Sequence, residues 1–519
     1  MIDSFSKNGI CQLLNENDIP NPLSSSLMEN IEHLKIVFKA CDDLVFHFTD
    51  FDNQSGCLVY LSEMVSNQAM FEIEQGLSSF VDTPDLKESL PPFILKRFPM
   101  SCGLVLNHNQ SMVEQILDGN TILLIDGLET AFVFRSSNNE GRNIQNPPTE
   151  RTVRGSREGF VEDLQKNIML IRRKIKTPSL KVENVVIGKQ TNTQIRVVYI
   201  QGVASDEIVK EVHQRLAKIN IDGILESHYI ESMIKDHPRS PVPTIFNTER
   251  PDRVCGSLLD GKVAILIDGT PFVLTVPAVF VEFLHSNEDY YDSSLVATVI
   301  RWVRFLGLFV TLILPAFYVG LTTFHQDLLQ DPFLIKLAAN REALPYPVII
   351  EAIFMLMTFE LVREAGLRMP KTFGSAAITI LGLVIISQTA VQAGIIGPAL
   401  TVVISVTSLT SFILPNYAFH QIMRFSGLPL LLLAGMFGFM GIIVGLMFGL
   451  AYLVSIRSFG VPYFSPVSPA RKESWKDVFV RAPWWAMKTR PAGLDVHNFH
   501  RATDSNATSL PRDKEEKER

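Results

Sequence analysis

The sequence predicts an α/β region of two related units, then an all-α multi-pass membrane domain of four to five spans and a short basic tail. Long uncharged apolar runs occur only after Arg304, whereas the first 300 residues have ordinary soluble composition. Hydrophobic residues make up 47% of the chain and charged residues 19%, against roughly 25% charged in a typical soluble protein. Part of the chain is therefore expected to face lipid.

The first 285 residues divide by composition and pattern. Residues 1–30 are polar and rich in Ser and Asn, which predicts a flexible lead-in. Helical and strand patterns alternate over 31–140 and define a first α/β unit. Residues 141–150 contain Asn residues and a Pro pair, which predicts a linker. A second α/β unit is expected at 151–285.

Short motifs recur between these two units in the same order. The pairs are 117–119 with 259–261, 124–127 with 266–269, 132–133 with 272–273 after a two-residue deletion, and 59–60 with 198–199. The repeated Asp-Gly pairs resemble a catalytic site, but two of them lie between β-rich runs. A hairpin there needs a residue with positive φ, so we interpret them as turns.

A helix is expected directly after the linker, with Glu162 four residues before Lys166 as local support. Its basic end is interpreted as a solvated helix terminus favoured by the helix dipole. Contact with anionic lipid or a partner is the alternative. The basic residues are Arg172, Arg173, Lys174 and Lys176.

Several function classes are not supported by the sequence. The formal net charge of -7 and the absence of a basic stripe give no reason to expect nucleic acid. The five cysteines form no CxxC pair, so we expect free thiols in a reducing compartment. No enzymatic, cofactor or metal motif is present, and we expect no enzyme activity, no cofactor and no metal. The N-terminus lacks a signal-peptide pattern, so the α/β region is expected to be cytoplasmic.

The membrane domain is expected over 295–457. Residues 305–324 carry no charge and, at 1.5 Å per residue, span the ~30 Å apolar core of a bilayer. Arg301 and Arg304 flank this run, and basic residues favour the cytoplasmic face. Further apolar segments are 374–394, 399–418 and 428–455.

The last of these segments places Gly441, Gly445 and Gly449 at four-residue spacing. Small residues on one face let a neighbouring helix approach closely. We interpret the three glycines as helix packing, with a hinge as the alternative.

Segment 347–366 decides the topology. Glu351 and Glu360 are nine residues apart and fall on opposite helix faces. Interfacial anchoring and an ion-binding role explain these intramembrane carboxylates about equally. If the segment spans the membrane, there are five spans and the tail lies outside. If it does not, there are four and the tail is cytoplasmic, which we favour. The tail, 458–519, is basic with Trp residues that suggest an interfacial patch, and its end is expected to be disordered.

Polar stripes follow one face of each of two helices. They indicate either helix–helix hydrogen bonding or a path lined by small polar groups. An oligomer would allow both, with one helix per subunit around a central path. The candidate path-lining residues are Ser375, Thr379, Gly382, Thr389, Thr401, Ser405 and Ser408.

The stretch ERTVRGSREGFVEDLQKNIMLIRRKIK at 150–176 resembles the most distinctive block of the A subunits of bacterial spore germinant receptors, the GerA family. Four further blocks support the resemblance: PVIIEAIFMLMTFELVREAGLRMPK at 347–371, IISQTAVQAGIIGPAL at 385–400, SFGVPYFSP at 458–466 and DVFVRAPWWAMKTRP at 477–491. A branch of the family encoded with stage V sporulation proteins shares most of these blocks. The APWWAMKTRP segment is more similar to the nutrient receptor subunits.

The resemblance implies a subunit of a nutrient-sensing receptor in the spore inner membrane. Such subunits act with a permease-like B subunit and a lipoprotein C subunit, and the A subunit is expected to form a homo-oligomer whose membrane helices enclose an ion path. A secondary transporter and a non-conducting scaffold are the alternatives. The resemblance gives no chemical role to the block residues Arg154, Arg157, Glu158, Phe160, Glu162 and Asp163.

Overall fold

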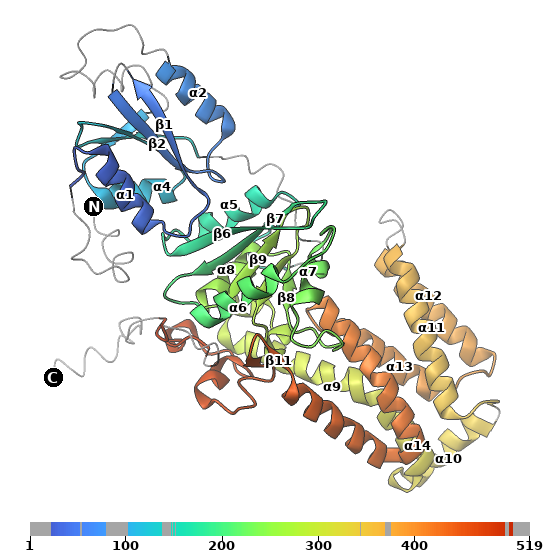
Figure 1. Ribbon diagram of the computed structural model, residues 1–519. Helices are drawn as coiled ribbons and strands as arrows, with labels where there is room; N and C mark the ends of the chain where they lie inside the picture. Colours follow the sequence, from blue (N-terminus) through green and yellow to red (C-terminus); the bar gives the residue numbers. More distant parts are fainter. Residues whose placement is uncertain are drawn as a thin grey trace, which may run out of the picture. The chain divides into compact units, whose positions relative to one another are not determined.

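The computed structural model describes residues 22–51, 54–78, 102–137, 147, 149–150, 152–342, 344–368, 375–491, 493 and 498–501 (Figure 1). The expected lead-in up to residue 21, most of the expected linker and the end of the tail lie outside the described residues. The chain forms two compact units. One contains the described residues up to Pro238, Ile245–Ala278 and those from Trp484 onward; the other contains Arg239–Thr244 and Val279–Pro483.

The first of the two compact units begins with a five-stranded sheet of order β1-β2-β4-β5-β3, in which every pair is antiparallel. Helices α1 and α4 cover one face, where Ile31 and Met112 pack with Val59. Helix α2 covers the other face, where Ile73 packs with Leu58. Neighbouring strand residues point to opposite faces, so Leu58 and Val59 serve different cores. The elements are α1 Leu27–Val37, β1 Leu44–Phe51, β2 Gln54–Leu61, α2 Asn67–Ser78, β3 Cys102–Leu106, α4 Asn109–Leu117, β4 Thr121–Ile125 and β5 Ala131–Phe134.

A second sheet repeats this strand order as β6-β7-β9-β10-β8. Helices α5 and α8 pack on one of its faces through Ile168 and Leu258. The identical order agrees with the repeat expected from the sequence. The elements are α5 Leu164–Lys174, β6 Leu180–Ile187, β7 Thr193–Ile200, α6 Asp206–Ala217, α7 Ser227–Ile234, β8 Phe246–Thr248, α8 Pro251–Leu259, β9 Val263–Ile267 and β10 Val273–Val276.

Strand register tests the motif matches. Val59 lies opposite Ile122, and Val198 lies opposite Ala264. Ile122 and Ala264 are 142 residues apart, the offset of the Asp-Gly motifs, so the match of 59–60 with 198–199 is confirmed.

The match of 132–133 with 272–273 is wrong. Leu124 pairs with Ala131, and in the second sheet Ile265 pairs with Leu274. Between the two sheets, the second strand of the hairpin is therefore shifted by the same 142 residues as the first strand. No residue is deleted. Phe132 corresponds to Leu274 rather than to Phe272. The Phe-Val pair shared by the two segments is therefore a coincidence of sequence.

The Asp-Gly pairs occupy turns of two kinds. Gly127 and Gly269 both have a φ of 85°, in the loops that join β4 to β5 and β9 to β10. These hairpin turns are confirmed, although each loop has five residues and is longer than a two-residue turn. Gly119 and Gly261, with φ of 86° and 93°, follow the ends of α4 and α8. A left-handed residue there closes the helix end.

The second compact unit is mainly helical. Among the described residues, α9 and α14 are the helices whose length and apolar composition would let them cross a bilayer. Helix α11 carries charged side chains, and α13 has 14 residues. The expected number of four or five spans therefore stays a prediction. The elements are η1 Phe280–Leu284, η2 Asn287–Tyr290, α9 Ser294–Phe324, η3 Gln326–Leu328, α10 Asp331–Glu342, α11 Val348–Arg368, α12 Ser375–Gln392, α13 Pro398–Ser411, α14 Tyr417–Ser455, β11 Arg457–Ser458, β12 Val461–Pro462 and η5 Lys472–Asp477.

The apolar segment 428–455 does not form one continuous helix, because α14 is broken at Gly438, which has φ 61° and ψ -141° (Figure 1). A Cβ placed on Gly445 would lie 2.7 Å from the Leu430 side chain. In one straight helix these residues would be ~22 Å apart. The chain after Gly438 therefore folds back on the chain before it, a reversal that only glycine adopts without strain.

The three glycines of the expected packing stripe lie just after this break. A Cβ on Gly441 would lie 2.1 Å from the Leu433 carbonyl oxygen, whereas Gly449 has nothing within 4 Å. Gly441 and Gly445 thus permit close approach between the two halves of α14.

Candidate functional site

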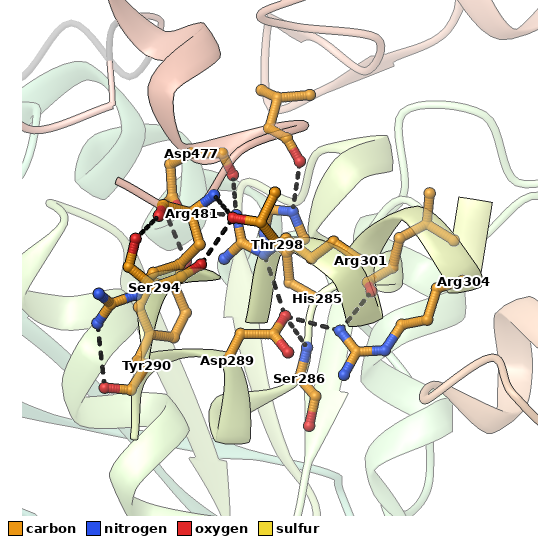
Figure 2. A network of polar contacts seen from close by, with 12 residues as sticks. His285, Ser286, Asp289, Tyr290, Ser294, Thr298, Arg301, Arg304, Asp477 and Arg481 are labelled. Carbon is orange, nitrogen blue, oxygen red and sulfur yellow. Dashed lines mark hydrogen bonds and ion pairs between the residues drawn. The ribbon is translucent and has the colours of Figure 1, made fainter. Parts of the chain in front are cut away.

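A buried network of charged residues surrounds the start of α9 in the helical unit (Figure 2). It is built on a short helix, η2, whose first turn is closed by a capping box between Ser286 and Asp289. Such a box satisfies two backbone N–H groups reciprocally. It also fixes the Asp289 carboxylate, which is 2% exposed, facing α9.

Two arginines of α9 share this carboxylate. Arg301 Nε lies 3.2 Å and Arg304 Nη1 2.6 Å from Asp289 Oδ2. Residues three apart lie on the same helix face, so both guanidinium groups reach one acceptor. Arg304 also donates to the Leu284 carbonyl oxygen at 3.3 Å. The charge of Asp289 is therefore divided between two buried cations.

The C-terminal tail completes the network. Arg301 Nη1 donates to the Asp477 carbonyl oxygen at 2.6 Å and to its carboxylate at 2.9 Å. Tyr290 donates its hydroxyl proton to the other carboxylate oxygen at 2.8 Å. Ser294 Oγ donates to the Arg481 carbonyl oxygen at 2.7 Å. Residues 477–481 are thus held at the N-terminal end of α9.

Arg481 is 3% exposed and donates to the Tyr290 carbonyl oxygen at 3.2 Å. Burial lowers the pKa of its guanidinium, against the effect of Asp477. The sequence suggested Arg301 and Arg304 as basic residues flanking a span. Both are buried in ion pairs, so they act here as internal structural charges.

The start of the block at 150–176 contacts the side chain of Arg250, which is 2% exposed and precedes α8. Arg250 Nη1 donates to the Glu150 carbonyl oxygen at 3.1 Å and to Thr152 Oγ1 at 3.0 Å. Its Nη2 donates to the Ser156 carbonyl oxygen at 3.0 Å and contacts Asp252 at 2.7 Å. One arginine side chain therefore fixes three positions of the block.

The candidate residues of this block have structural contacts. Phe160 is buried, and its N–H donates to the Glu249 carbonyl oxygen at 2.8 Å. Asp163 caps α5, accepting from Gln165 N at 3.0 Å and Lys166 N at 3.4 Å. Cap residues of this kind satisfy the free N–H groups of a helix start.

Four further positions of the block lie nearer the surface. The Glu162 carbonyl oxygen accepts from Gly269 N at 2.9 Å. Arg154 and Arg157 are exposed. Glu158 contacts Lys174 Nζ at 2.7 Å, and that hydrogen bond lowers the pKa of its carboxyl group. The described contacts bring none of the six block residues into one cleft.

The interpretation of the α5 end as fully solvated is wrong for Arg172. Its guanidinium is 1% exposed and makes two hydrogen bonds to Asp43, of 2.9 and 2.8 Å. Lys174 and Lys176 do form exposed pairs, with Glu158 and Asp118. The basic run therefore has a buried member that its composition alone did not distinguish.

Glu351 lies in the first turn of α11 and is 3% exposed. Its Oε2 accepts from Gly397 N at 3.1 Å, and Arg341 lies 3.9 Å away. Gly397 precedes the first residue of α13. A carboxylate at that position complements the positive end of the α13 dipole. Glu351 thus stabilises a second helix as well as its own.

Glu360 has different neighbours. It pairs with Arg363 of its own helix, and Arg424 of α14 lies 3.3 Å away. Glu351 and Glu360 share no partner among the contacts of the described residues. This agrees with the expectation that they lie on opposite faces and form no carboxylate pair.

The candidate path-lining residues differ in exposure. Thr389 is exposed, and its hydroxyl donates to the Ile385 carbonyl oxygen at 2.8 Å. Thr401 and Ser405 are half-buried, whereas Ser408 is 3% exposed inside the bundle. A Cβ on Gly382 would lie 3.8 Å from Val362 of α11. The side chains of Ser375 and Thr379 lie outside the described residues.

Within the described part of the chain, no group of three or more His, Cys, Asp or Glu side chains could hold a metal ion.

Comparison with known proteins gives the family. Residues 32–493 match the sequence profile described as Bacillus/Clostridium GerA spore germination protein. The chain belongs to the GerA family. Among its relatives, spore germination protein KA of Bacillus subtilis (strain 168) is 40% identical over 488 residues, which cover 92% of this chain and 88% of that protein. The uncharacterized membrane protein YfkQ of the same strain is 39% identical over 480 residues, covering 92% and 93%.

A solved structure is also similar to this GerA family chain. It is the crystal structure of the N-terminal domain of the A subunit of the Bacillus megaterium spore germinant receptor GerK3. It is 30% identical and covers 50% of this chain and 97% of that chain, with a TM-score of 0.39.

Sequence reasoning missed the residues that organise the polar network. Asp289 lies in an ordinary-looking segment, NEDYYD, with no motif to mark it. A signal did exist for Asp477 and Arg481, since both fall in the quoted block DVFVRAPWWAMKTRP. The block carried the family resemblance, but nothing in it indicated that it packs at the start of α9.

Proposed function

We propose that this GerA family chain is the A-type membrane subunit of a nutrient-sensing germinant receptor in the spore inner membrane, with its α/β region cytoplasmic. Family membership and the relative named spore germination protein KA support this role. A receptor subunit binds and transmits rather than catalyses, which agrees with the expectation of no enzyme activity. The partners would be a permease-like B subunit and a lipoprotein C subunit.

Two observations support a membrane domain with an even number of spans. Large apolar side chains of the helical unit are exposed, among them Phe309 at 55%, Leu361 at 71% and Phe448 at 68%. Lipid would cover such side chains in a spanning domain. Asp477 lies at the N-terminal end of α9, so the chain enters and leaves the bundle at the same end. An even number of spans satisfies this, and the tail is then on the cytoplasmic side.

The ion path is the finer part of the proposal. Copies of the chain would assemble with α12 and α13 facing a central path, which opens when the permease-like subunit binds a germinant. The observation that carries it is the exposure of the α12 face. Val384 is 54% and Ile385 55% exposed, and Thr389 on the same helix is exposed too. A helix face left uncovered in one chain is available to a second copy or to lipid.

Ion flux through the purified protein in liposomes tests this path. Thr389→Leu and Ser405→Leu should each reduce flux at least several-fold while the oligomer still forms, because an apolar side chain replaces a hydroxyl facing the path. Thr358→Leu is the matched control, since Thr358 in α11 makes the same hydrogen bond of 2.8 Å to the carbonyl oxygen four residues earlier. Flux unaltered in both test variants would reject the path.

Two other functions have distinct outcomes in the same experiment. A non-conducting scaffold subunit would give folded oligomer with no flux unless its partner subunits are present. A secondary transporter is favoured by one observation, the break of α14 at Gly438, because transporters bind solute at broken helices. It would show saturable solute uptake coupled to an ion gradient.

A further inference from the structure

A small cavity lies inside the helical bundle, and four helices contribute to its wall. Apolar residues form most of the lining, including Phe359, Phe425 and Leu428. The polar part of the wall consists of hydroxyl groups and two charged residues. These are Thr311 of α9, Thr407 and Ser408 of α13, Glu360 of α11 and Arg424 of α14.

Arg424 is the unusual member of this wall. Its side chain is 7% exposed. In the described part of the chain, its Nε, Nη1 and Nη2 atoms have no hydrogen-bond partner. The guanidinium group has five N–H donors and no acceptor, and leaving buried donors unsatisfied is costly. A ligand that accepts hydrogen bonds would remove that cost.

Glu360 does not satisfy Arg424 alone, because Arg363 shares it. Arg363 pairs with the same Oε2 atom that lies 3.3 Å from Arg424 Nη2. The Arg363 side chain is 9% exposed, and its Nε and Nη1 also lack hydrogen-bond partners among the described residues. Two buried cations therefore face one carboxylate, and the cluster has a net charge of about +1.

Thr311 of α9 supplies a further donor to the cavity wall. It is 3% exposed, and its Oγ1 has no hydrogen-bond partner among the described residues. The unsatisfied groups thus include guanidinium N–H donors and one hydroxyl, around a site with excess positive charge. Apolar side chains around such donors exclude water and strengthen their attraction for a negative ligand.

We propose that this cavity binds one small monovalent anion of halide size, held by Arg424 and Thr311 and balancing the charge that Glu360 leaves uncompensated. The anion would fix the Arg424 end of α14 against α9 and α11. This site is independent of the proposed ion path, since it lies inside one subunit and needs no neighbouring copy.

Thermal unfolding of the purified full chain in detergent tests the site, with sodium chloride compared with sodium gluconate at equal ionic strength. Gluconate is too large for the cavity. We expect a higher Tm in chloride, rising to a plateau with concentration as a bound ligand requires. Arg424→Gln should abolish the difference, whereas Arg368→Gln should keep it, because Arg368 is an exposed arginine paired with Glu364.

A second variant keeps the test decisive if Arg424→Gln does not fold. Glu360→Gln retains both arginines and removes the competing carboxylate, so it should lower the chloride concentration at half-effect several-fold. Bromide should give anomalous scattering within hydrogen-bond distance of the Arg424 guanidinium in crystals. An equal Tm in the two salts for the unmodified chain, or an undiminished chloride effect in Arg424→Gln, would overturn the proposal. Ion flux is not measured, so the outcome is separate from that of the path.

Discussion

Arg172 of α5 and Asp43 of the first α/β unit form a two-point ion pair across the two halves of the repeat, with N–O distances of 2.9 and 2.8 Å. Their side chains are 1% and 0% exposed. Glu63 and Arg196 form a second contact of this kind at 3.5 Å. Val182 N–H also donates to the Ala40 carbonyl oxygen at 3.2 Å. The two sheets are thus joined by buried polar contacts.

Asp43→Asn should destabilise the α/β region by about 3–5 kcal/mol, because it leaves the Arg172 charge buried without its counterion. The change in free energy of unfolding can be measured by urea titration of the region expressed alone. Asp43→Leu combined with Arg172→Met should be closer to wild type than either single change, since an apolar pair leaves no charge buried.

The exposed pair Asp118–Lys176 is the matched control, with side chains 44% and 54% exposed. Asp118→Asn should cost less than about 1 kcal/mol, because solvent screens exposed pairs. Equal losses in Asp43→Asn and Asp118→Asn would contradict the assignment of Asp43 as the stabilising partner.

Asp289→Asn should lower the Tm of the full chain in detergent markedly, with an expected loss of about 3–5 kcal/mol. The change removes the negative charge that Arg301 and Arg304 share. Asp477→Asn should cost less, because Asp477 is 37% exposed and Arg301 still contacts Asp289. Asp327→Asn, at an exposed position, is the control and should change stability by no more than about 0.5 kcal/mol.

Glu158 should make stability depend on pH. The hydrogen bond from Lys174 lowers the folded-state pKa of Glu158 below its unfolded value. A depressed carboxyl pKa contributes stability above the unfolded pKa, and that stability is lost as pH falls through the folded pKa. Glu158→Gln should therefore cost about 0.2–1 kcal/mol at pH 7, and the difference should vanish in acid. A constant difference from pH 7 to pH 3 would contradict this account.

Cys57 and Cys255 should resist alkylation while the protein is folded. Burial raises the pKa of each thiol to about 12, so roughly one thiol in ten thousand is ionised at pH 8, and the thiolate is the reactive form. Mass spectrometry after iodoacetamide treatment at pH 8 should find both unmodified, and both modified in urea. Ser232→Cys, at an exposed position, is the reactive control. Labelling of Cys57 as fast as this control would argue against burial.

The reversal at Gly438 predicts a cross-link. Cysteines placed at Leu430 and Gly445 should be joined by a short bis-maleimide reagent, because the Leu430 side chain lies 2.7 Å from a Cβ built on Gly445. A Leu430–Met447 pair is the control, since Met447 is 61% exposed and Leu430 is 5% exposed. Peptide mapping identifies the link. If the first pair does not cross-link in folded protein, the result contradicts the reversal at Gly438.

The repeat was readable from the sequence, and part of the fold with it. Asp126-Gly127 and Asp268-Gly269 mark hairpins because positive φ favours glycine. The family resemblance was likewise carried by local motifs. Phe272 was misplaced because two identical letters outweighed strand register, which depends on pairing with β9 and is invisible in a single segment.

The polar clusters were harder to predict, because their members are distant in the sequence. Arg172 and Asp43 are 129 residues apart, and the run Arg172–Lys174 has the composition of any solvated helix end. Gly438 is one of several glycines in an apolar stretch, and nothing beside it indicates a reversal. Glu351 and Glu360 could be placed on opposite faces from helix geometry alone, but Arg341 and Arg424, which approach them from other helices, could not be assigned as their neighbours.

The Arg301–Asp477 contact has a consequence for biosynthesis. The two residues are 176 positions apart, so at ~5–20 residues per second a ribosome finishes Asp477 about 10–35 s after Arg301. All the apolar helices emerge in that interval, before the tail exists to meet the start of α9. Nascent chains therefore pass through a stage in which the helices are inserted but Arg301, near the start of α9, has no contact with Asp477. The contact can form only after Asp477 has been synthesised. We expect chains truncated before Asp477 to stay at that stage and to be degraded faster than the full chain.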